Sequence, residues 1–322
     1  GSYLQGRGLD FVGLDTSVKK SILTFAKGSS HCKASSCLID GRSSAESKVD
    51  TKWISLYGTE NEVSGCSFID KKNMGCLLVV WLEDGIVPRH TISNNYFTRP
   101  CTLLGDNGKA ANGQECIRIG TSDFSLNDAC CLVTGNFFYR CHGELAEIIS
   151  NKSCGNVYQG NYFSQCKGSL TLRHGNRCVV RGNYFTADGV SDVGAIRIIG
   201  EDHLVEDNVM VGITGKGYKS AICLVRGESN AALNGYWTVK NAIIRNNWII
   251  NCQSGMEFNY SGRDTQDTAP KGTKVQNNTI ICSGNQASLT LIDMFPSAIK
   301  WTDNVIYGGV QNGVSLKTVK EA

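Results

Sequence analysis

Charged side chains recur at a regular interval in the middle of the chain, where Lys152, Arg173 and Arg197 are separated by 21 and 24 residues. Glu144 and Glu147 precede the lysine, and carboxylates of this kind hold hard cations such as calcium. A lysine takes up a proton only in its neutral form, which neighbouring positive charges favour, whereas an arginine stays charged and stabilises developing negative charge. These residue types predict removal of a proton from a carbon next to a carboxylate, with a cation neutralising that carboxylate. The alternative is a set of structural ion pairs, which also cluster charge.

A six-residue pattern, apolar-x-[Gly/Asn/Asp]-Asn-x-apolar, recurs along the chain at steps of 22 to 41 residues. Each unit alternates short β-branched or aromatic runs with Gly or Asn turns, and it lacks the framework of a leucine-rich repeat. The pattern predicts an all-β fold, a right-handed parallel β-helix in which equivalent asparagines stack into a hydrogen-bonded ladder. The copies are ISNNYF (92–97), VTGNFF (133–138), YQGNYF (158–163), VRGNYF (180–185), VEDNVM (205–210), IRNNWI (244–249), VQNNTI (275–280) and WTDNVI (301–306).

Residues that are one repeat apart lie on neighbouring coils of such a solenoid. Lys152, Arg173 and Arg197 are therefore expected to come close together in space. Inside the solenoid, side chains at matching positions of successive repeats are expected to pack in columns. The predicted columns are Phe138, Phe163 and Phe185, and Cys141, Cys166 and Cys252.

The composition allows a substantial core, since 41% of the 322 residues are apolar and 19% are charged. We expect a single β-helix domain over residues 1–322. The net charge of +3 argues against a nucleic-acid partner, and no apolar run is long enough for a membrane span. The fifteen cysteines are odd in number and form no CxxC pairs, so burial is favoured over a zinc site or disulfides for most of them.

The N-terminal residues differ from the start of an exported precursor. The first residues, GSYLQGRGLDFVG, contain no charged-then-apolar signal segment. The repeat is already under way in GLDFVG (8–13), and no capping helix precedes it. We therefore expect the chain to be truncated at its N-terminal cap.

Four longer motifs are specific enough to be compared with known families. They show that the stretch Asn112–Asn208 resembles polysaccharide lyase family 6, the family of alginate lyases and chondroitinase B. A weaker similarity extends through most of the chain. The matching segments are NGQECIRIGTS (112–122), GELAEIISNKS (143–153), GNYFSQCKGSLTLRHGN (160–176) and GAIRIIGEDH (194–203).

The resemblance implies a role for each matching residue. In that family the lysine of the NKS segment is the Brønsted base and the arginine of the RHG segment is the acid, which are Lys152 and Arg173 here. The implied calcium ligands are Asn112, Glu144 and Glu147, with Glu115 nearby as a substitute for the asparagine. The implied substrate contacts are Arg197, His174, Arg118, His203 and Tyr260.

Three positions leave structural alternatives open. An ion pair with Glu147 accounts equally well for Arg118, and a hydrogen-bonded turn histidine accounts equally well for His203. The family usually has GExE before the IIS strand, whereas this chain has GELAE, with one extra residue between the two carboxylates. A bulge is expected there if Glu144 and Glu147 are to reach one ion.

The resemblance implies that the chain cleaves alginate by β-elimination with the help of calcium. The segment LTLRHGN is closer to the alginate lyases than to chondroitinase B. The alternatives are a dermatan sulfate lyase, a mannuronan C5-epimerase that begins with the same proton abstraction, and a non-catalytic glycan-binding β-helix. The expected partner is an acidic polysaccharide, the expected state is a monomer, and the expected location is secreted or periplasmic.

Overall fold

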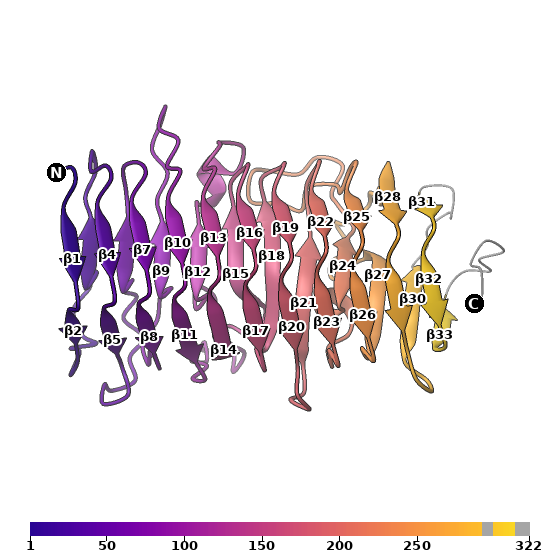
Figure 1. Cartoon of the computed structure of the whole chain (residues 1–322), viewed down its shortest axis with the longest axis horizontal. Coiled ribbons are helices and arrows are strands. Elements are labelled where there is room, and N and C mark those ends of the chain that lie inside the picture. The colour runs from indigo at the N-terminus through magenta and orange to yellow at the C-terminus, as the bar shows by residue number, and fades with distance from the viewer. Residues whose placement is uncertain (292–298, 313–322) are drawn as a thin grey trace.

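The computed structural model describes residues 1–291 and 299–312, and these residues form one elongated stack of coils (Figure 1). Three parallel sheets of 11 strands each run the length of the stack. Within the described residues the only helical segments are two single 3₁₀ turns, η1 (Ser122–Phe124) and η2 (Gly217–Lys219). No helix in these residues is long and apolar enough to cross a membrane. The predicted all-β, parallel β-helix is confirmed.

Each coil supplies one strand to each sheet, in the same order along the chain. The first sheet contains β1 (Gln5–Arg7), β4 (Lys33–Ser35), β7 (Glu62–Ser64), β10 (Thr91–Ser93), β13 (Leu132–Thr134), β16 (Val157–Gln159), β19 (Val179–Arg181), β22 (Leu204–Glu206), β25 (Ile243–Arg245), β28 (Thr273–Gln276) and β31 (Ile299–Thr302). The second sheet contains β2 (Asp10–Phe11), β5 (Leu38–Asp40), β8 (Ser67–Ile69), β11 (Tyr96–Arg99), β14 (Phe137–Cys141), β17 (Tyr162–Ser164), β20 (Tyr184–Thr186), β23 (Val209–Val211), β26 (Trp248–Ile250), β29 (Thr279–Ile281) and β32 (Val305–Tyr307). The third sheet contains β3 (Leu23–Phe25), β6 (Ile54–Leu56), β9 (Leu78–Val80), β12 (Ile117–Ile119), β15 (Glu147–Lys152), β18 (Gly168–His174), β21 (Val193–Ile198), β24 (Ile222–Val225), β27 (Ser254–Tyr260), β30 (Ala287–Leu291) and β33 (Val310–Asn312).

Columns of identical side chains fill the interior, as the repeat predicts. The rings of Phe138, Phe163 and Phe185 stack with centroids 4.6 and 4.5 Å apart and planes within 4° of parallel. Phe68 and Phe97 extend this column toward the N-terminus. Each ring covers the face of the next, so the apolar area is removed from water without gaps between coils.

The cysteines are mostly core residues, as the sequence predicts. All fifteen lie within the described residues as free thiols, and only Cys101 and Cys130 are not buried. The backbone N–H of Cys141 donates to Sγ of Cys166 at 3.4 Å, so the predicted cysteine column exists at these two coils. Cys252 is also fully buried.

A ladder of asparagine side chains runs along the turn between the first and second sheets. Asn161 is typical: its Nδ2 donates to the carbonyl of Val133 and to Oδ1 of Asn183, each at 2.9 Å. Its Oδ1 accepts from the backbone N–H and from Nδ2 of Asn136, at 3.0 and 2.9 Å. The amide therefore satisfies the backbone of the turn and fixes one coil against the next. The members of the ladder are Asn95, Asn136, Asn161, Asn183, Asn208, Asn247, Asn278 and Asn304.

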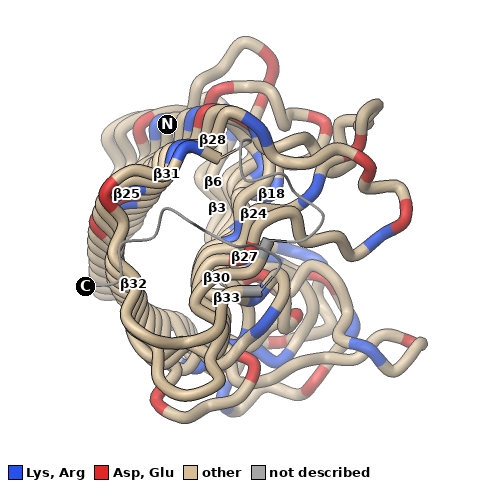
Figure 2. Tube along the Cα trace, turned by 90° about the vertical axis from the view of Figure 1, so that its right-hand side faces the viewer, with Lys and Arg blue, Asp and Glu red and all other residues tan. Residues whose placement is uncertain are grey.

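The loops that project farthest from the solenoid lie beside the third sheet, and many charged residues lie on them (Figure 2). They lie within the three longest steps between successive copies of the repeat. Loop 100–116 lies between β11 and β12, loop 226–242 between β24 and β25, and loop 261–272 between β27 and β28. The regular turns of the other two sheets leave the third sheet as the face where a site can be built.

We expect Asn161→Ala to lower the free energy of unfolding by about 3 kcal/mol, since each buried hydrogen-bonding group left unpaired costs about 1–3 kcal/mol. Gln159→Ala is the matched control, because the side chain of Gln159 makes one exposed hydrogen bond, with Arg181. Its effect should stay within about 0.5 kcal/mol. Urea unfolding followed by circular dichroism measures both. Equal effects of the two variants would contradict a stabilising ladder.

Candidate active site

Three neighbouring strands of the third sheet carry the charged residues that the repeat spacing singles out. Lys152 ends β15, Arg173 lies near the end of β18, and Arg197 lies in β21. In the sheet, Lys152 is paired with His174 and Thr171 with Arg197. The prediction that the three residues lie on adjacent coils is confirmed.

A cleft of about 480 Å³ opens on the outer face of these strands. It is lined by most of the residues that the sequence predicts for the site, together with aromatic and cationic residues from the long loops. The predicted residues that line it are Asn112, Glu144, Glu147, Lys152, Arg173, His174, Arg197 and Tyr260. Arg118 and His203 lie outside it.

Loop 226–242 fixes the guanidinium of Arg173. Nη1 donates to the carbonyl of Gly235 at 2.8 Å, and Nη2 donates to the carbonyl of Asn234 at 3.1 Å. The guanidinium carbon lies 4.1 Å from the ring centroid of Tyr236, and Arg263 approaches the same ring at 5.0 Å. Arg173 is therefore held in one orientation while it keeps its charge.

Sequence reasoning missed these loop residues. Asn234, Tyr236 and Arg263 line the cleft, as do Tyr218 and Gln266. The signals available were the step of 39 residues between Asn208 and Asn247 and the step of 31 residues between Asn247 and Asn278, which mark insertions. These steps locate the loops, but the loop side chains show no periodicity from which their orientation follows.

His174 is neutral and links Arg173 to the opposite wall. Its Nδ1 lies 3.4 Å from Nη1 of Arg173, and a guanidinium only donates, so Nδ1 accepts. Nε2 then carries the hydrogen and donates to Oγ of Ser122 at 3.3 Å. Burial, with the charges of Arg173 and Lys152, lowers the pKa of His174 to about 3. His174 can bind a substrate oxygen as a dipole, without a positive charge.

Lys152 is half-buried and faces the cleft. Within the part of the chain that the structure describes, its Nζ makes no hydrogen bond or ion pair. The other lysine close to the cleft, Lys219, is paired with Asp192. Lys152 is thus the amine available for proton transfer.

Three carboxylates meet at one end of the cleft. Ligand atoms of Glu115, Glu144 and Glu147 all lie within 4.8 Å of one another. Glu115 is 2% exposed and Glu147 is 8% exposed. Burial, reinforced by the charges of the two other carboxylates, raises the pKa of Glu144 well above its usual range. We call these three residues the acidic cluster.

The acidic cluster is bonded mainly by neutral hydrogen-bond donors. The backbone N–H of Gly113 donates to Oε2 of Glu144 at 2.8 Å, and the thiol of Cys76 donates to Oε2 of Glu115 at 3.0 Å. Among the described residues, the one ion pair of the cluster joins Nη2 of Arg197 to Oε1 of Glu147 at 3.8 Å. Two buried carboxylates and one half-buried carboxylate, with one distant guanidinium, form an oxygen donor set that fits a calcium ion.

The backbone around GELAE is irregular at two points, and its β-bulge falls after Glu147 and not between the two carboxylates as expected. Leu145 adopts a left-handed conformation with φ of 63°. The pairing of β15 with β18 shifts by one residue between Glu147 and Ile149, which is a β-bulge. Both Glu144 and Glu147 therefore reach the cluster, and Glu115 joins them from the segment that also carries Asn112.

The structure places the two remaining candidates in other settings. His203 is buried in a turn, where its Nδ1 accepts from the N–H of Cys178 at 3.1 Å and its Nε2 donates to the carbonyl of Ile199 at 3.0 Å. His203 is therefore a hydrogen-bonded turn histidine, the structural alternative to a substrate contact. Arg118 lies with its guanidinium 5.1 Å from the ring centroid of Trp81, and Glu147 is paired with Arg197 instead.

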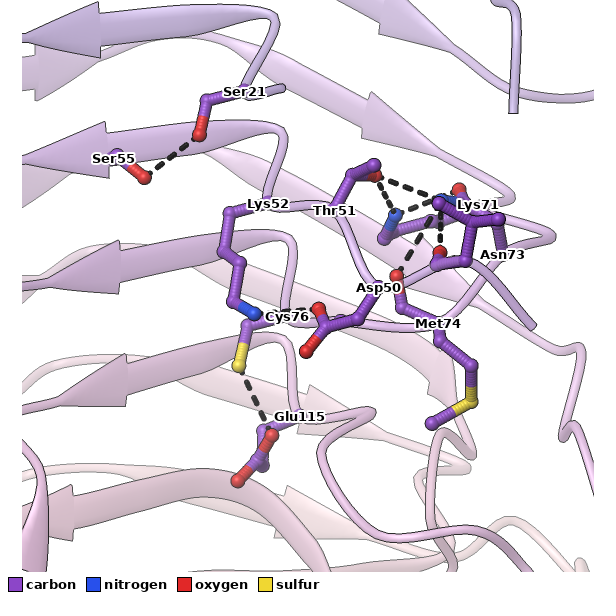
Figure 3. Close-up of polar contacts among 12 residues, drawn as sticks. Ser21, Asp50, Thr51, Lys52, Ser55, Lys71, Asn73, Met74, Cys76 and Glu115 are labelled. Carbon is purple, nitrogen blue, oxygen red and sulfur yellow. Dashed lines mark hydrogen bonds and ion pairs between the residues drawn. The ribbon is translucent and has the colours of Figure 1, made fainter. Parts of the chain in front are cut away.

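A buried polar network lies in the segment just before Cys76, whose thiol bonds to Glu115 of the acidic cluster (Figure 3). Lys71 is fully buried, and its Nζ donates to Oδ1 of Asn73 at 2.7 Å and to Oγ1 of Thr51 at 3.2 Å. Burial, with the nearby charge of Arg99, lowers the pKa of Lys71 to about 6. Arg99 in turn donates to the carbonyls of Asn73, Gly75 and Gln114, which fixes the segment that leads into Glu115.

Comparison with known proteins assigns this parallel β-helix, with Lys152, Arg173 and the acidic cluster beside one cleft, to a family. The family model described as Chondroitinase B matches residues 1–312. The chain belongs to the family of chondroitinase B and the polysaccharide lyase family 6 (PL6) alginate lyases. No curated protein sequence matches it.

Solved structures give the same assignment. The PL6 family alginate lyase AlyGC is 33% identical, with a TM-score of 0.91 over 100% of this chain and 44% of AlyGC. A mannuronic acid specific family 6 lyase from human gut microbiota is 29% identical, with a TM-score of 0.80 over 95% of this chain and 69% of that one. A PL6 lyase from Pseudopedobacter saltans, 23% identical with a TM-score of 0.72 over 94% and 75%, shares the fold. The chain thus spans less than half the length of AlyGC.

The burial of Lys71 predicts a specific pH dependence of stability. Its folded pKa of about 6 lies below the value of about 10.4 for an unfolded lysine, so unfolding takes up a proton between these pH values. Stability relative to Lys71→Met should therefore rise with pH from 6 to 10, by at most about 1.4 kcal/mol per pH unit.

Urea unfolding of both proteins at several pH values measures this difference. Lys19→Met, which removes an exposed lysine, is the control and should run parallel to the wild type. If Lys71→Met also runs parallel to the wild type, Lys71 is charged in the folded protein and the account of the network is wrong.

Proposed function

We propose that the chain carries the active site of a polysaccharide lyase that cleaves alginate by β-elimination. The observation that carries the proposal is the position of Lys152, an amine without a partner among the described residues, in the same cleft as Arg173 and the acidic cluster. The similarity to AlyGC, an alginate lyase, supports alginate as the substrate.

Calcium is the proposed cofactor. Glu115, Glu144 and Glu147 would hold it, with Asn112 as a further oxygen ligand from the wall of the same cleft. When bound, the ion supplies positive charge that neutralises the carboxylate of a uronate and so makes the neighbouring C5 proton more acidic. Without an ion, the same carboxylates would repel an anionic substrate.

The residues of the chain account for the two bond changes. Lys152 takes the C5 proton on the lone pair of Nζ, and the electron pair of the C–H bond forms the C4=C5 double bond. The C4–O4 bond breaks with its electron pair on O4, which takes a proton from solvent water and leaves as a hydroxyl group, while the proton on Lys152 returns to solvent. Arg173, fixed by the carbonyls of Asn234 and Gly235, stabilises the negative charge that develops on O4.

A dermatan sulfate lyase is the second candidate, because the matching family model is that of chondroitinase B. Both polymers contain uronates, and both are cleaved through the same proton abstraction. A panel of poly-mannuronate, poly-guluronate and dermatan sulfate separates them. An epimerase would differ from both, because it would invert C5 without producing a double bond.

Lys152→Ala should lower kcat on the preferred polymer by about 10²–10⁴-fold, the usual contribution of a general base. The ultraviolet absorbance of the C4=C5 double bond measures the rate. Lys167→Ala is the matched control, since Lys167 lies on the next coil and outside the cleft. Unchanged activity of Lys152→Ala would rule out this base, and a wild type that forms no double bond from any polyuronate would rule out the lyase.

Glu147→Gln should weaken calcium binding by about 10–100-fold or more, because even residues that only support a metal ligand contribute this much. Isothermal titration calorimetry measures the affinity directly, and a chelator should abolish activity in parallel. Glu83→Gln is the control, because Glu83 is a carboxylate paired with Lys27 outside the cleft. Full activity in the chelator would exclude an essential ion, but it would not argue against Lys152 as the base.

A further inference from the structure

Two long loops on neighbouring coils are joined beside the cleft. Loop 226–242 follows β24, and loop 261–272 follows β27 on the next coil. Their bases form an antiparallel bridge, in which the N–H of Gly227 donates to the carbonyl of Thr268 at 2.8 Å and the N–H of Thr268 donates back at 2.9 Å. These backbone bonds fix the two loops against each other at the base.

Glu228 lies in the neck of the first loop and bonds to residues of both loops. Its backbone N–H donates to the carbonyl of Tyr236 at 2.7 Å, and its Oε2 accepts from the backbone N–H of Tyr236 at 3.1 Å. Its Oε1 accepts from Oγ1 of Thr265, in the second loop, at 2.9 Å. Glu228 therefore closes residues 229–235 into a tight turn and ties that turn to the second loop.

The closed turn carries the groups that fix Arg173. The carbonyls of Asn234 and Gly235 accept from the guanidinium, and the ring of Tyr236 lies 4.1 Å from the guanidinium carbon. Gly235 packs so closely against the carboxylate of Glu228 that a Cβ would lie 2.6 Å from Oε2. The position of this carboxylate therefore determines where the acceptors of Arg173 lie.

Glu228 itself lies outside the cleft. It is absent from the lining, and among the described residues it makes no ion pair. The two donors to its carboxylate are a backbone N–H and a hydroxyl group, which are both neutral. A carboxylate with this set of partners connects two loops and does not serve as the counter-ion of a guanidinium.

We propose that Glu228 is a positioning residue for Arg173. It holds the carbonyls of Asn234 and Gly235, and the ring of Tyr236, where they orient the guanidinium. It does so through the geometry of its hydrogen bonds and not through its charge. The proposal rests on the proposed function, in which Arg173 stabilises the charge that develops on O4. A misplacement of about 1 Å in such a group can lower a rate about 10²-fold.

Glu228→Ala should lower kcat about 10–100-fold and leave KM within about twofold, because the guanidinium acts on the departing oxygen in the transition state. Glu228→Gln should keep kcat within about threefold, since its amide oxygen can accept from Tyr236 while its amide nitrogen donates to the hydroxyl of Thr265. Ser229→Ala is the matched control and should match the wild type, because its hydroxyl bonds to Asp267 across the same pair of loops. The ultraviolet absorbance of the C4=C5 double bond measures the rates.

A double-mutant cycle separates positioning from general support of the cleft. If Glu228 acts through Arg173, Glu228→Ala should cause no further loss of rate in the Arg173→Ala background. An equal loss in both backgrounds would show that Glu228 acts by another route. A Glu228→Gln variant as slow as Glu228→Ala would show that the charge is required, and an unchanged kcat in Glu228→Ala would show that neither matters. Each of these results overturns the proposal.

Nuclear magnetic resonance of isotope-labelled arginine gives a readout that does not depend on activity. A fixed guanidinium shows separate Nη signals, and those of Arg173, identified by their loss in Arg173→Ala, should merge in Glu228→Ala. Unchanged signals in the folded variant would contradict the proposal. If Glu228→Ala does not fold, Glu228→Asp, whose carboxylate lies closer to the backbone, takes its place. Failure of the proposed function appears separately, as the absence of unsaturated product from the wild type, and it leaves this readout valid.

Discussion

Buried asparagine amides fix the register between neighbouring coils, and the arrangement of the candidate site depends on that register. Each amide bonds to the equivalent amides of the coils before and after it. Asn161, for example, accepts a hydrogen bond from Asn136 and donates one to Asn183. A slip of one residue in a strand would turn Lys152 inward and Asn151 outward, because side chains alternate across a strand. The ladder on one side of the solenoid thereby determines which side chains face the cleft on the other.

The rigid scaffold also holds charges that a mobile surface would not keep together. Repulsion within the acidic cluster is tolerated because β15, β18 and the segment after Arg99 are fixed by sheet pairing and buried hydrogen bonds. Arg173 is held by backbone carbonyls instead of a carboxylate, so its charge stays available to the substrate. Neutral His174 lies between Arg173 and Ser122 and bonds to both side chains. Each group is placed to interact with a charge that the ligand brings.

The sequence was sufficient for the fold because the repeat is local and periodic. It also predicted the cluster around Lys152, since spacing in a solenoid converts directly into distance. It was insufficient for Tyr236 and Arg263, whose positions depend on contacts between two long loops and not on any periodicity. His203 could not be distinguished from a ligand, because a turn histidine and a substrate histidine share the same local sequence. Glu115 was a candidate only as a substitute for Asn112, and it took the path of loop 100–116 to show that it lies beside Glu144 and Glu147 in the acidic cluster.

The central claim is that one uronate is held between the acidic cluster and Lys152. A crystal structure of Lys152→Ala with calcium and a tetrauronate tests it most directly. The account predicts an ion bound by Glu115, Glu144 and Glu147 that also contacts the carboxylate of a sugar, with C5 of that sugar facing position 152. A saccharide bound with C5 turned toward another residue, or bound away from the acidic cluster, would contradict it.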